Sequence, residues 1–328
     1  MKYRAKLHPS LNTVVLAAAL LVLIVAGSLL HPNFLTAGNI MSILQQMSEN
    51  GILALGLTLV IITGNIDISI GSTMGLCATV SGLCMAGGMN FLVAILISLI
   101  VAVACGLLNG LMVAVIKVPA MIATLGTQML FNGIALGLSE GGSISQLDPN
   151  IYFLGQGRIA GIPFQAILLL IAIIVTTILL KKTRLGRKLF AIGNNQKASQ
   201  YAGIDTVKVV FISLIICAVL CCVAGLIQVG RVSTARADMG SAYLMECISA
   251  VVLGGTSIAG GKGTTIGSIA GVLIFTLISN IMNLVEISTF WQQFTTGVVL
   301  ILVVIFNKIS ENGKNRKSVS ALSLQEES

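Results

Sequence analysis

The sequence predicts an all-α, polytopic integral membrane protein with about ten transmembrane helices and with both termini in the cytoplasm. Of its 328 residues, 56% are hydrophobic and 9% are charged, and the mean hydropathy is +1.00. A soluble chain carries about a quarter of its residues as charges, so this composition excludes an ordinary water-soluble domain. Because a helix needs about 20 apolar residues to cross a bilayer, the chain has room for about ten spans.

Apolar runs bounded by glycine, proline, asparagine or charge predict the individual spans. Helices are expected because a bilayer leaves the backbone polar groups of an open strand unsatisfied, and the sequence lacks the alternation of a closed barrel. The first run is longer than the apolar core of a secretory signal, which favours a retained span over a cleaved one. The predicted spans are residues 11–30, 44–63, 67–86, 91–116, 119–138, 164–181, 209–229, 242–257, 264–284 and 289–307.

Basic residues predict the orientation. An even number of spans places both termini on one side, and all nineteen Lys and Arg residues except Arg158, Arg231 and Arg236 then fall on that side. By the positive-inside rule this side is the cytoplasm. The predicted organisation is a cytoplasmic N-terminus (1–10), a transmembrane domain (11–307) with an outer loop (139–163) and an inner loop (182–208), and a disordered cytoplasmic tail (308–328).

Two glycine-rich segments form a weak internal echo. Residues 61–75 and 251–267 each contain an apolar run, a polar turn that begins with glycine, and a Gly-Ser or Gly-Thr start to the next run. Duplication of a helical hairpin, as in many transporters, and independent convergence on glycine-rich packing both explain this echo. The hairpin-motif residues are Gly64, Asp67, Gly71, Gly254, Gly255, Gly260 and Gly261.

Enzyme chemistry is not expected in this chain. A phosphate-binding loop would need glycine and Ser or Thr where the chain has Thr256 and Gly263. Two histidines, His8 and His31, and no carboxylate pair at catalytic spacing leave no triad and no metal site. The seven cysteines lie in apolar runs and are interpreted as small packing residues. Scattered basic residues form no nucleic-acid face, so we expect no bound cofactor, metal or nucleic acid.

Uncharged polar residues in the spans predict a path for a neutral polar solute. Amides offer hydrogen-bond donors and acceptors without the cost of a buried charge, although each of them equally suits a contact between helices. Glu246 lies either on such a path or at the outer interface, and it gives thin support to the alternative of an ion-coupled secondary transporter. The candidate path residues are Gln45, Gln46, Asn50, Gln128, Asn132, Glu246, Asn280 and Asn283.

Three segments in order resemble the membrane permease subunits of bacterial ABC sugar importers of the ribose and autoinducer-2 group. They are TGNIDISIGS at 63–72, TRLGRKLFAIGNNQKASQYAGI at 183–204 and VVLGGTSIAGGKGT at 251–264, and the likeness runs from Asn33 to Val304. The resemblance implies a multi-pass protein of the bacterial inner membrane that forms the path for a small neutral sugar or sugar-like solute. It also implies four partners: a second permease copy or paralogue, a cytoplasmic ATP-binding subunit that uses ATP and Mg, an extracytoplasmic sugar-binding protein, and membrane lipids.

The resemblance further implies that the inner loop engages the ATPase. By charge alone, the same loop equally suits anionic lipid. The chain departs from the family at Asn65, where glycine is usual, and at Leu244, the first position of an acidic-apolar-acidic stretch. These departures leave the particular sugar open, and within the family we expect an autoinducer-2-like or rhamnose-like solute. The implied coupling positions are Gly186, Arg187, Ala191, Gly193, Asn194, Ala198, Ala202, Gly203 and Ile204.

Overall fold

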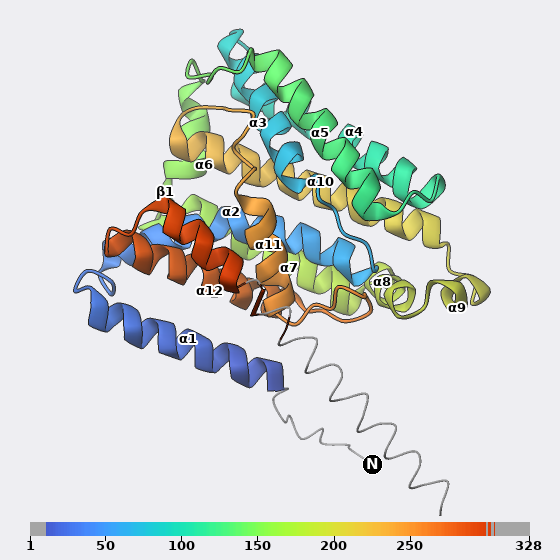
Figure 1. The fold of residues 1–328 in the computed structure, drawn as a ribbon. Helices are drawn as coiled ribbons and strands as arrows, with labels where there is room; N and C mark the ends of the chain where they lie inside the picture. Colours follow the sequence, from blue (N-terminus) through green and yellow to red (C-terminus); the bar gives the residue numbers. More distant parts are fainter. Residues whose placement is uncertain (1–10, 300, 303–304, 306–328) are drawn as a thin grey trace, which may run out of the picture.

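The computed structural model describes residues 11–299, 301–302 and 305, so the predictions for residues 1–10 and 308–328 lie outside the described residues. The described chain folds mainly into helices that pack into one bundle (Figure 1). In chain order the elements are α1 (Leu11–Leu30), α2 (Ala37–Ile62), α3 (Ile70–Ala86), α4 (Phe91–Gly110) with a π-helical turn (Leu111–Val115), α5 (Ala120–Ser139), a 3-10 turn (Pro149–Ile151), α6 (Tyr152–Gln156), β1 (Arg158–Ile159), β2 (Ile162–Pro163), α7 (Phe164–Lys182), α8 (Arg184–Asn194), α9 (Gln196–Tyr201), α10 (Thr206–Val232), α11 (Tyr243–Leu253) and α12 (Thr265–Leu284). Residues 289–299 are also helical.

Each predicted span coincides with a helix, which confirms the helical prediction. Among the described residues, α1, α3 and α11 are shorter apolar helices. Helix α2 is continuous over 26 residues, but the polar stretch 45–50 interrupts its apolar sequence. Nearly all the β structure in the described part of the chain is the two-residue hairpin of β1 and β2 in the outer loop. Within the part of the chain that the structure describes, five helical segments are long and apolar enough to cross a bilayer: Phe91–Val115, Ala120–Ser139, Phe164–Lys182, Thr206–Val232 and Thr265–Leu284.

Helices α2 and α10 lie at the centre and run in opposite directions. Gly56 of α2 faces Cys217 of α10, and Glu49, earlier in α2, contacts Arg231, later in α10. A Cβ on Gly56 would lie 3.2 Å from the Cys217 Cα, so glycine permits this close approach. All residues of α2 from 47 to 62 are buried. This antiparallel pair is therefore the scaffold on which the other helices pack.

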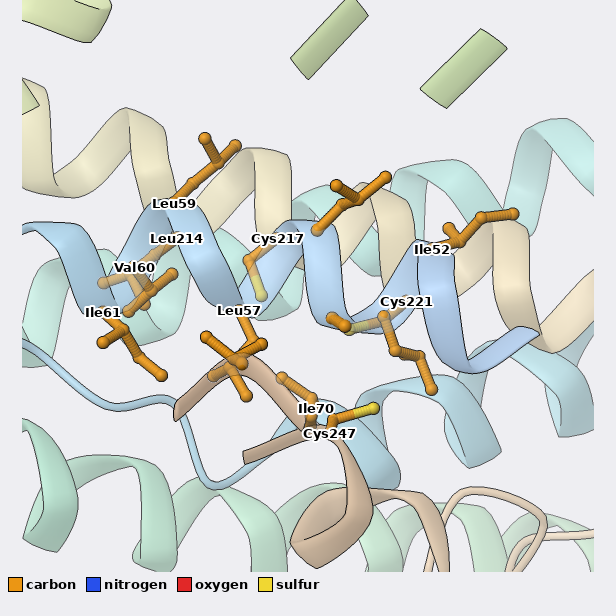
Figure 2. Close-up of a cluster of buried hydrophobic side chains, with 14 of the residues drawn as sticks. Ile52, Leu57, Leu59, Val60, Ile61, Ile70, Leu214, Cys217, Cys221 and Cys247 are labelled. Carbon is orange, nitrogen blue, oxygen red and sulfur yellow. The ribbon is translucent and has the colours of Figure 1, made fainter. Parts of the chain in front are cut away.

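The cysteines serve as packing residues, as predicted. Cys84 is half-buried, the other six are buried, and all are free thiols. Figure 2 shows Cys217 and Cys221 of α10 and Cys247 of α11 among aliphatic side chains of α2. Small, weakly polar thiols suit such contacts.

Gly106 and Gly110 of α4 have the GxxxG spacing that permits close packing of helices. A Cβ at Gly106 would lie 2.6 Å from the Ile215 Cα of α10, and one at Gly110 would lie 2.6 Å from the Phe211 ring. The two glycines therefore let α4 approach α10 closely.

Two long helices are each followed by a non-helical stretch and a shorter helix. Residues 63–69 separate α2 from α3, and residues 233–242 separate α10 from α11. Irregular backbone is tolerated at membrane depth where protein surrounds it and supplies its hydrogen bonds. Thr124 does this for the first stretch, since its hydroxyl accepts from the Ile68 N–H (3.0 Å) and donates to the Ile66 carbonyl (3.2 Å).

The second stretch corresponds to the connection that the sequence leaves between the predicted spans 209–229 and 242–257. The Ala237 carbonyl lies against Gly75 of α3, and the Gly240 carbonyl lies against Gly71. A Cβ at either glycine of α3 would collide with these carbonyls. This contact between distant segments draws residues 233–242 into the protein. Helix α11 starts at Tyr243, as the predicted span does within one residue, but ends at Leu253 and so has only 11 residues.

The two breaks define a repeat that differs from the predicted echo. The order of long helix, non-helical stretch, short helix and longer helix occurs in α2 to α4 and again in α10 to α12. Because α2 and α10 are antiparallel, the two units start in opposite directions. The glycine-rich turns of the echo occupy different places in them: residues 63–69 precede the short helix, whereas residues 254–264 follow it.

Candidate functional site

Three distant segments meet at one end of the bundle. The Gly261 N–H donates to the Ile62 carbonyl (2.9 Å), and a Cβ on Gly193 of α8 would collide with both groups. Gly64 and Gly260 approach each other with φ values of 82° and 89°, a region that favours glycine. The inner loop is thus seated directly on the two glycine-rich turns.

The inner loop is built from two capped helices. The Thr183 hydroxyl accepts from the Gly186 N–H (3.1 Å) at the start of α8, and the Asn195 side chain accepts from the Ala198 N–H (2.9 Å) at the start of α9. Side-chain caps of this kind satisfy N–H groups that a helix start leaves unpaired. The second of these helices, α9, runs from Gln196 to Tyr201.

The nine implied coupling residues divide into supporting and exposed groups. Gly186 is buried, because a Cβ there would collide with the end of α7, and Ala191, Gly193 and Ile204 are half-buried. The other five are exposed: Arg187, Asn194, Ala198, Ala202 and Gly203. The exposed members lie on α8, on α9 and directly after α9, at the end of the bundle where these helices protrude (Figure 1).

Tyr201 is a prominent residue of this surface that the sequence interpretation missed. It is 92% exposed at the end of α9 and is three residues after Ala198, on the same helical face. Its signal in the sequence was an aromatic residue within a short polar segment. We call Ala198, Tyr201 and Ala202 the α9 surface.

A cavity of about 260 Å³ lies between α3, α5 and the stretch that leads into α11. Gln128 and Asn132 are four residues apart on α5, so their amides share one helical face. None of the residues around the cavity is charged. The lining is Gly71, Ser72, Leu125, Gln128, Met129, Asn132, Gly240, Ser241 and Leu244.

A second cavity, of about 280 Å³, follows the first along the same two elements. Leu136 comes from α5 one turn after Asn132, and residues 236–238 precede Gly240. The Arg236 and Asp238 side chains, both more than half exposed, form an ion pair there (2.5 Å). We call the two cavities the inner cavity (with Gln128) and the outer cavity (with Arg236). The stretch 233–242 lines both.

Residues 39–304 match the family model described as "Branched-chain amino acid transport system / permease component". The chain belongs to this permease family. The permease is 38% identical over 291 residues to the ribose import permease protein RbsC of Escherichia coli (strain K12), covering 88% of this chain and 91% of the relative. It is 36% identical over 291 residues to RbsC of Bacillus subtilis (strain 168), covering 88% and 90%. The autoinducer 2 import system permease protein LsrC of Photorhabdus luminescens is 35% identical over 256 residues, covering 78% and 77%. No solved structure matches the chain.

The permease brings two of the predicted path residues, Gln128 and Asn132, into the inner cavity. Asn280 instead exchanges amide hydrogen bonds with Asn39 of α2 (2.8 and 2.9 Å), and Asn283 accepts from Gln292 (2.7 Å). Such bonds between helices are the second role that the sequence left open for amides.

The remaining predicted path residues lie on α2 and α11. Gln45 and Gln46 are half-buried on α2. Asn50 donates to the Glu246 carboxylate of α11 (3.0 Å), so this acid has a partner on α2. Glu246 does not line either cavity.

The hairpin-motif residues Asp67, Gly254 and Gly255 also have defined places. The Asp67 carboxylate accepts from the Ser69 N–H (2.8 Å) and hydroxyl (2.6 Å), which closes the turn before α3. Gly254 lies against the backbone of Gly267, so α11 and α12 pack closely. Gly255 has a φ of 88°, which ends α11.

A buried ionic network was not predicted. Glu49 is fully buried on α2, where its carboxylate accepts from the Arg231 Nε (2.6 Å) and Nη2 (3.0 Å) and from the Tyr243 hydroxyl (2.8 Å). The sequence placed Arg231 on the side opposite the cytoplasm, and its separation of 182 residues from Glu49 gave no signal for a pair. The usable signal was chemical, because a carboxylate inside a membrane helix needs a partner.

Proposed function

We propose that this permease forms the transmembrane path of an ABC importer for a small neutral sugar or sugar-like solute, and that a separate cytoplasmic ATPase powers it. The observation that carries the proposal is the uncharged inner cavity, whose polar side chains are the Ser72 and Ser241 hydroxyls and the Gln128 and Asn132 amides. Hydroxyls and amides both donate and accept hydrogen bonds, as recognition of sugar hydroxyls requires. The relatives named as ribose and autoinducer-2 permeases support the same solute class.

A branched-chain amino acid is the alternative that the family description suggests. Such a solute carries an ammonium and a carboxylate, which favour charge-assisted partners. The inner cavity has no charged lining residue, and the outer cavity has Arg236 and Asp238 already paired with each other. The lining therefore favours the neutral solute.

An ion-coupled secondary transporter is the other alternative, since Glu49 and Glu246 lie within helices α2 and α11. Arg231 and Tyr243 bind Glu49, and Asn50 binds Glu246. By contrast, the exposed α9 surface has no role in an ion-coupled mechanism and suits docking of a motor subunit. The ATP-driven mechanism is thus better supported.

We propose that the permease lies in the inner membrane of a bacterium. Its chain crosses this membrane ten times, and both termini lie in the cytoplasm. Helix α10 has 27 residues and is about 40 Å long. The inner loop precedes its first residue, whereas Gly155 of the outer loop packs against Arg231 near its last. The two long loops therefore lie at opposite ends of α10, and Lys262 lies at the same end as the basic inner loop, as the positive-inside rule requires.

The proposed assembly contains a second permease copy or paralogue, the ATPase with its ATP and Mg, and an extracytoplasmic sugar-binding protein. Deletion of the permease gene in its host is expected to abolish uptake of radiolabelled ribose or autoinducer-2 and to leave leucine uptake unchanged. Re-expression of the wild-type chain should restore uptake. Loss of leucine uptake with normal uptake of both other solutes would contradict the proposed solute class.

A further inference from the structure

One carboxylate contacts both ends of the stretch 233–242. Arg231 lies in the last turn of α10, directly before this stretch, and Tyr243 is the first residue of α11, directly after it. Both side chains bind Glu49: Arg231 through two nitrogens, and Tyr243 through its hydroxyl. The two ends, 12 residues apart in sequence, are therefore fastened to one point on α2.

The fastened stretch has little regular structure of its own. Ser233 ends α10 with a φ of 57°, and the next backbone pairing is the bridge between Ala235 and Ile144. Between these ends the stretch lies against Gly71 and Gly75 so closely that no Cβ fits. A small displacement would therefore change both cavities, because residues 236–238 line the outer one and Gly240 and Ser241 line the inner one.

The geometry at Glu49 suits a rigid anchor. Two parallel hydrogen bonds from a guanidinium to a carboxylate fix both distance and orientation. Glu49 is fully buried, so no water competes for its oxygens. From the outer loop, the Gln156 amide donates to the Arg231 carbonyl (3.1 Å) and to the Ser233 hydroxyl (3.0 Å), which holds the same end of the stretch from the other side.

We propose that Glu49 is a positioning residue that holds both ends of the stretch 233–242 and thereby sets the shape of the two cavities. Glu49 lines neither cavity, so it acts through Arg231 and Tyr243 and not through contact with solute. The inference rests on the proposed function only where it concerns solute passage. Its structural part, the anchoring, is testable without any solute.

Hydrogen exchange measured by mass spectrometry on the full-length permease in lipid nanodiscs tests the anchor. Glu49→Gln removes the charge that strengthens three hydrogen bonds, so amides of residues 234–243 should exchange roughly tenfold faster. Exchange in α7 should not change in Glu49→Gln. The control variant Glu286→Gln removes an exposed carboxylate on another loop, so it should leave exchange of residues 234–243 unchanged. Unchanged exchange of residues 234–243 in Glu49→Gln would overturn the inference.

Tyr243→Phe provides a second variant that keeps the ion pair, in case Glu49→Gln fails to fold. It should speed exchange of residues 240–245 and leave residues 231–235 as in the wild type. If the exchange rates of residues 240–245 and of residues 231–235 changed equally in this variant, relative to the wild type, the anchor would also be overturned. Solute uptake by Glu49→Gln should slow while its co-purification with the ATPase stays normal. Faster exchange with wild-type uptake would support the anchor and contradict the role of the cavities in the proposed function.

Discussion

Replacing Tyr201 with alanine is expected to uncouple the permease from its ATPase. Tyr201 is 92% exposed on the α9 surface, and tyrosines of this kind often dominate interface energies. Loss of about 2 kcal/mol at such a site weakens binding about 30-fold, so solute uptake and co-purification of the ATPase should both fall. Ala198→Glu should have a similar effect, because it places an unpaired charge on the same face.

The matched control is Tyr201→Phe, which keeps the ring and should retain docking. Membrane insertion is checked by adding one cysteine to the chain at either of two exposed positions, Lys197→Cys on α9 or Ser145→Cys in the outer loop, with the parent chain and its seven native cysteines as the labelling background. An impermeant thiol reagent should label them from opposite sides of the membrane, in the wild-type background and in Tyr201→Ala. Wild-type ATPase binding by Tyr201→Ala would contradict the proposed docking. Labelling of both cysteines from one side would contradict the proposed topology.

The second large effect is expected in the inner cavity. The double variant Gln128→Leu with Asn132→Leu removes both amides from its lining while keeping similar volumes. Hydrogen bonds lost at a buried polar solute cost about 1–3 kcal/mol each, so uptake should fall at least about tenfold. ATPase binding should be unaffected, because the amides lie on α5, away from the α9 surface.

Asn283→Leu is the matched control for this variant. Asn283 is also an amide within the helices, but it accepts from Gln292 and lines neither cavity. Loss of one such bond between helices costs about 0.6 kcal/mol, so uptake should stay near the wild-type rate. Wild-type uptake by the double variant, with a large loss in Asn283→Leu, would show that the path lies elsewhere.

The sequence predicted the helices well because their signal is local. Hydropathy placed every predicted span on a helix. The GxxxG spacing of Gly106 and Gly110 is likewise local, and these glycines let α4 approach α10 closely. Each of these features depends on residues that are near one another in the chain.

The features that the sequence did not predict depend on distant residues. The stretch 233–242 has the polar composition of an outer loop, and only its fit against Gly71 and Gly75 draws it into the bundle. The amides were a set of equivalent candidates until the fold separated Gln128 and Asn132 from Asn280 and Asn283. Likewise, the pairing of Glu49 with Arg231 requires the antiparallel contact of α2 with α10.

The most direct test of the central claim is solute uptake into proteoliposomes that contain the purified permease, with and without its ATPase and binding protein. We expect the permease alone to accumulate no ribose or autoinducer-2, with or without a pH gradient. Accumulation should appear when both partners and Mg-ATP are supplied. Accumulation driven by a pH gradient in liposomes that contain the permease alone would contradict the claim that a partner powers the path.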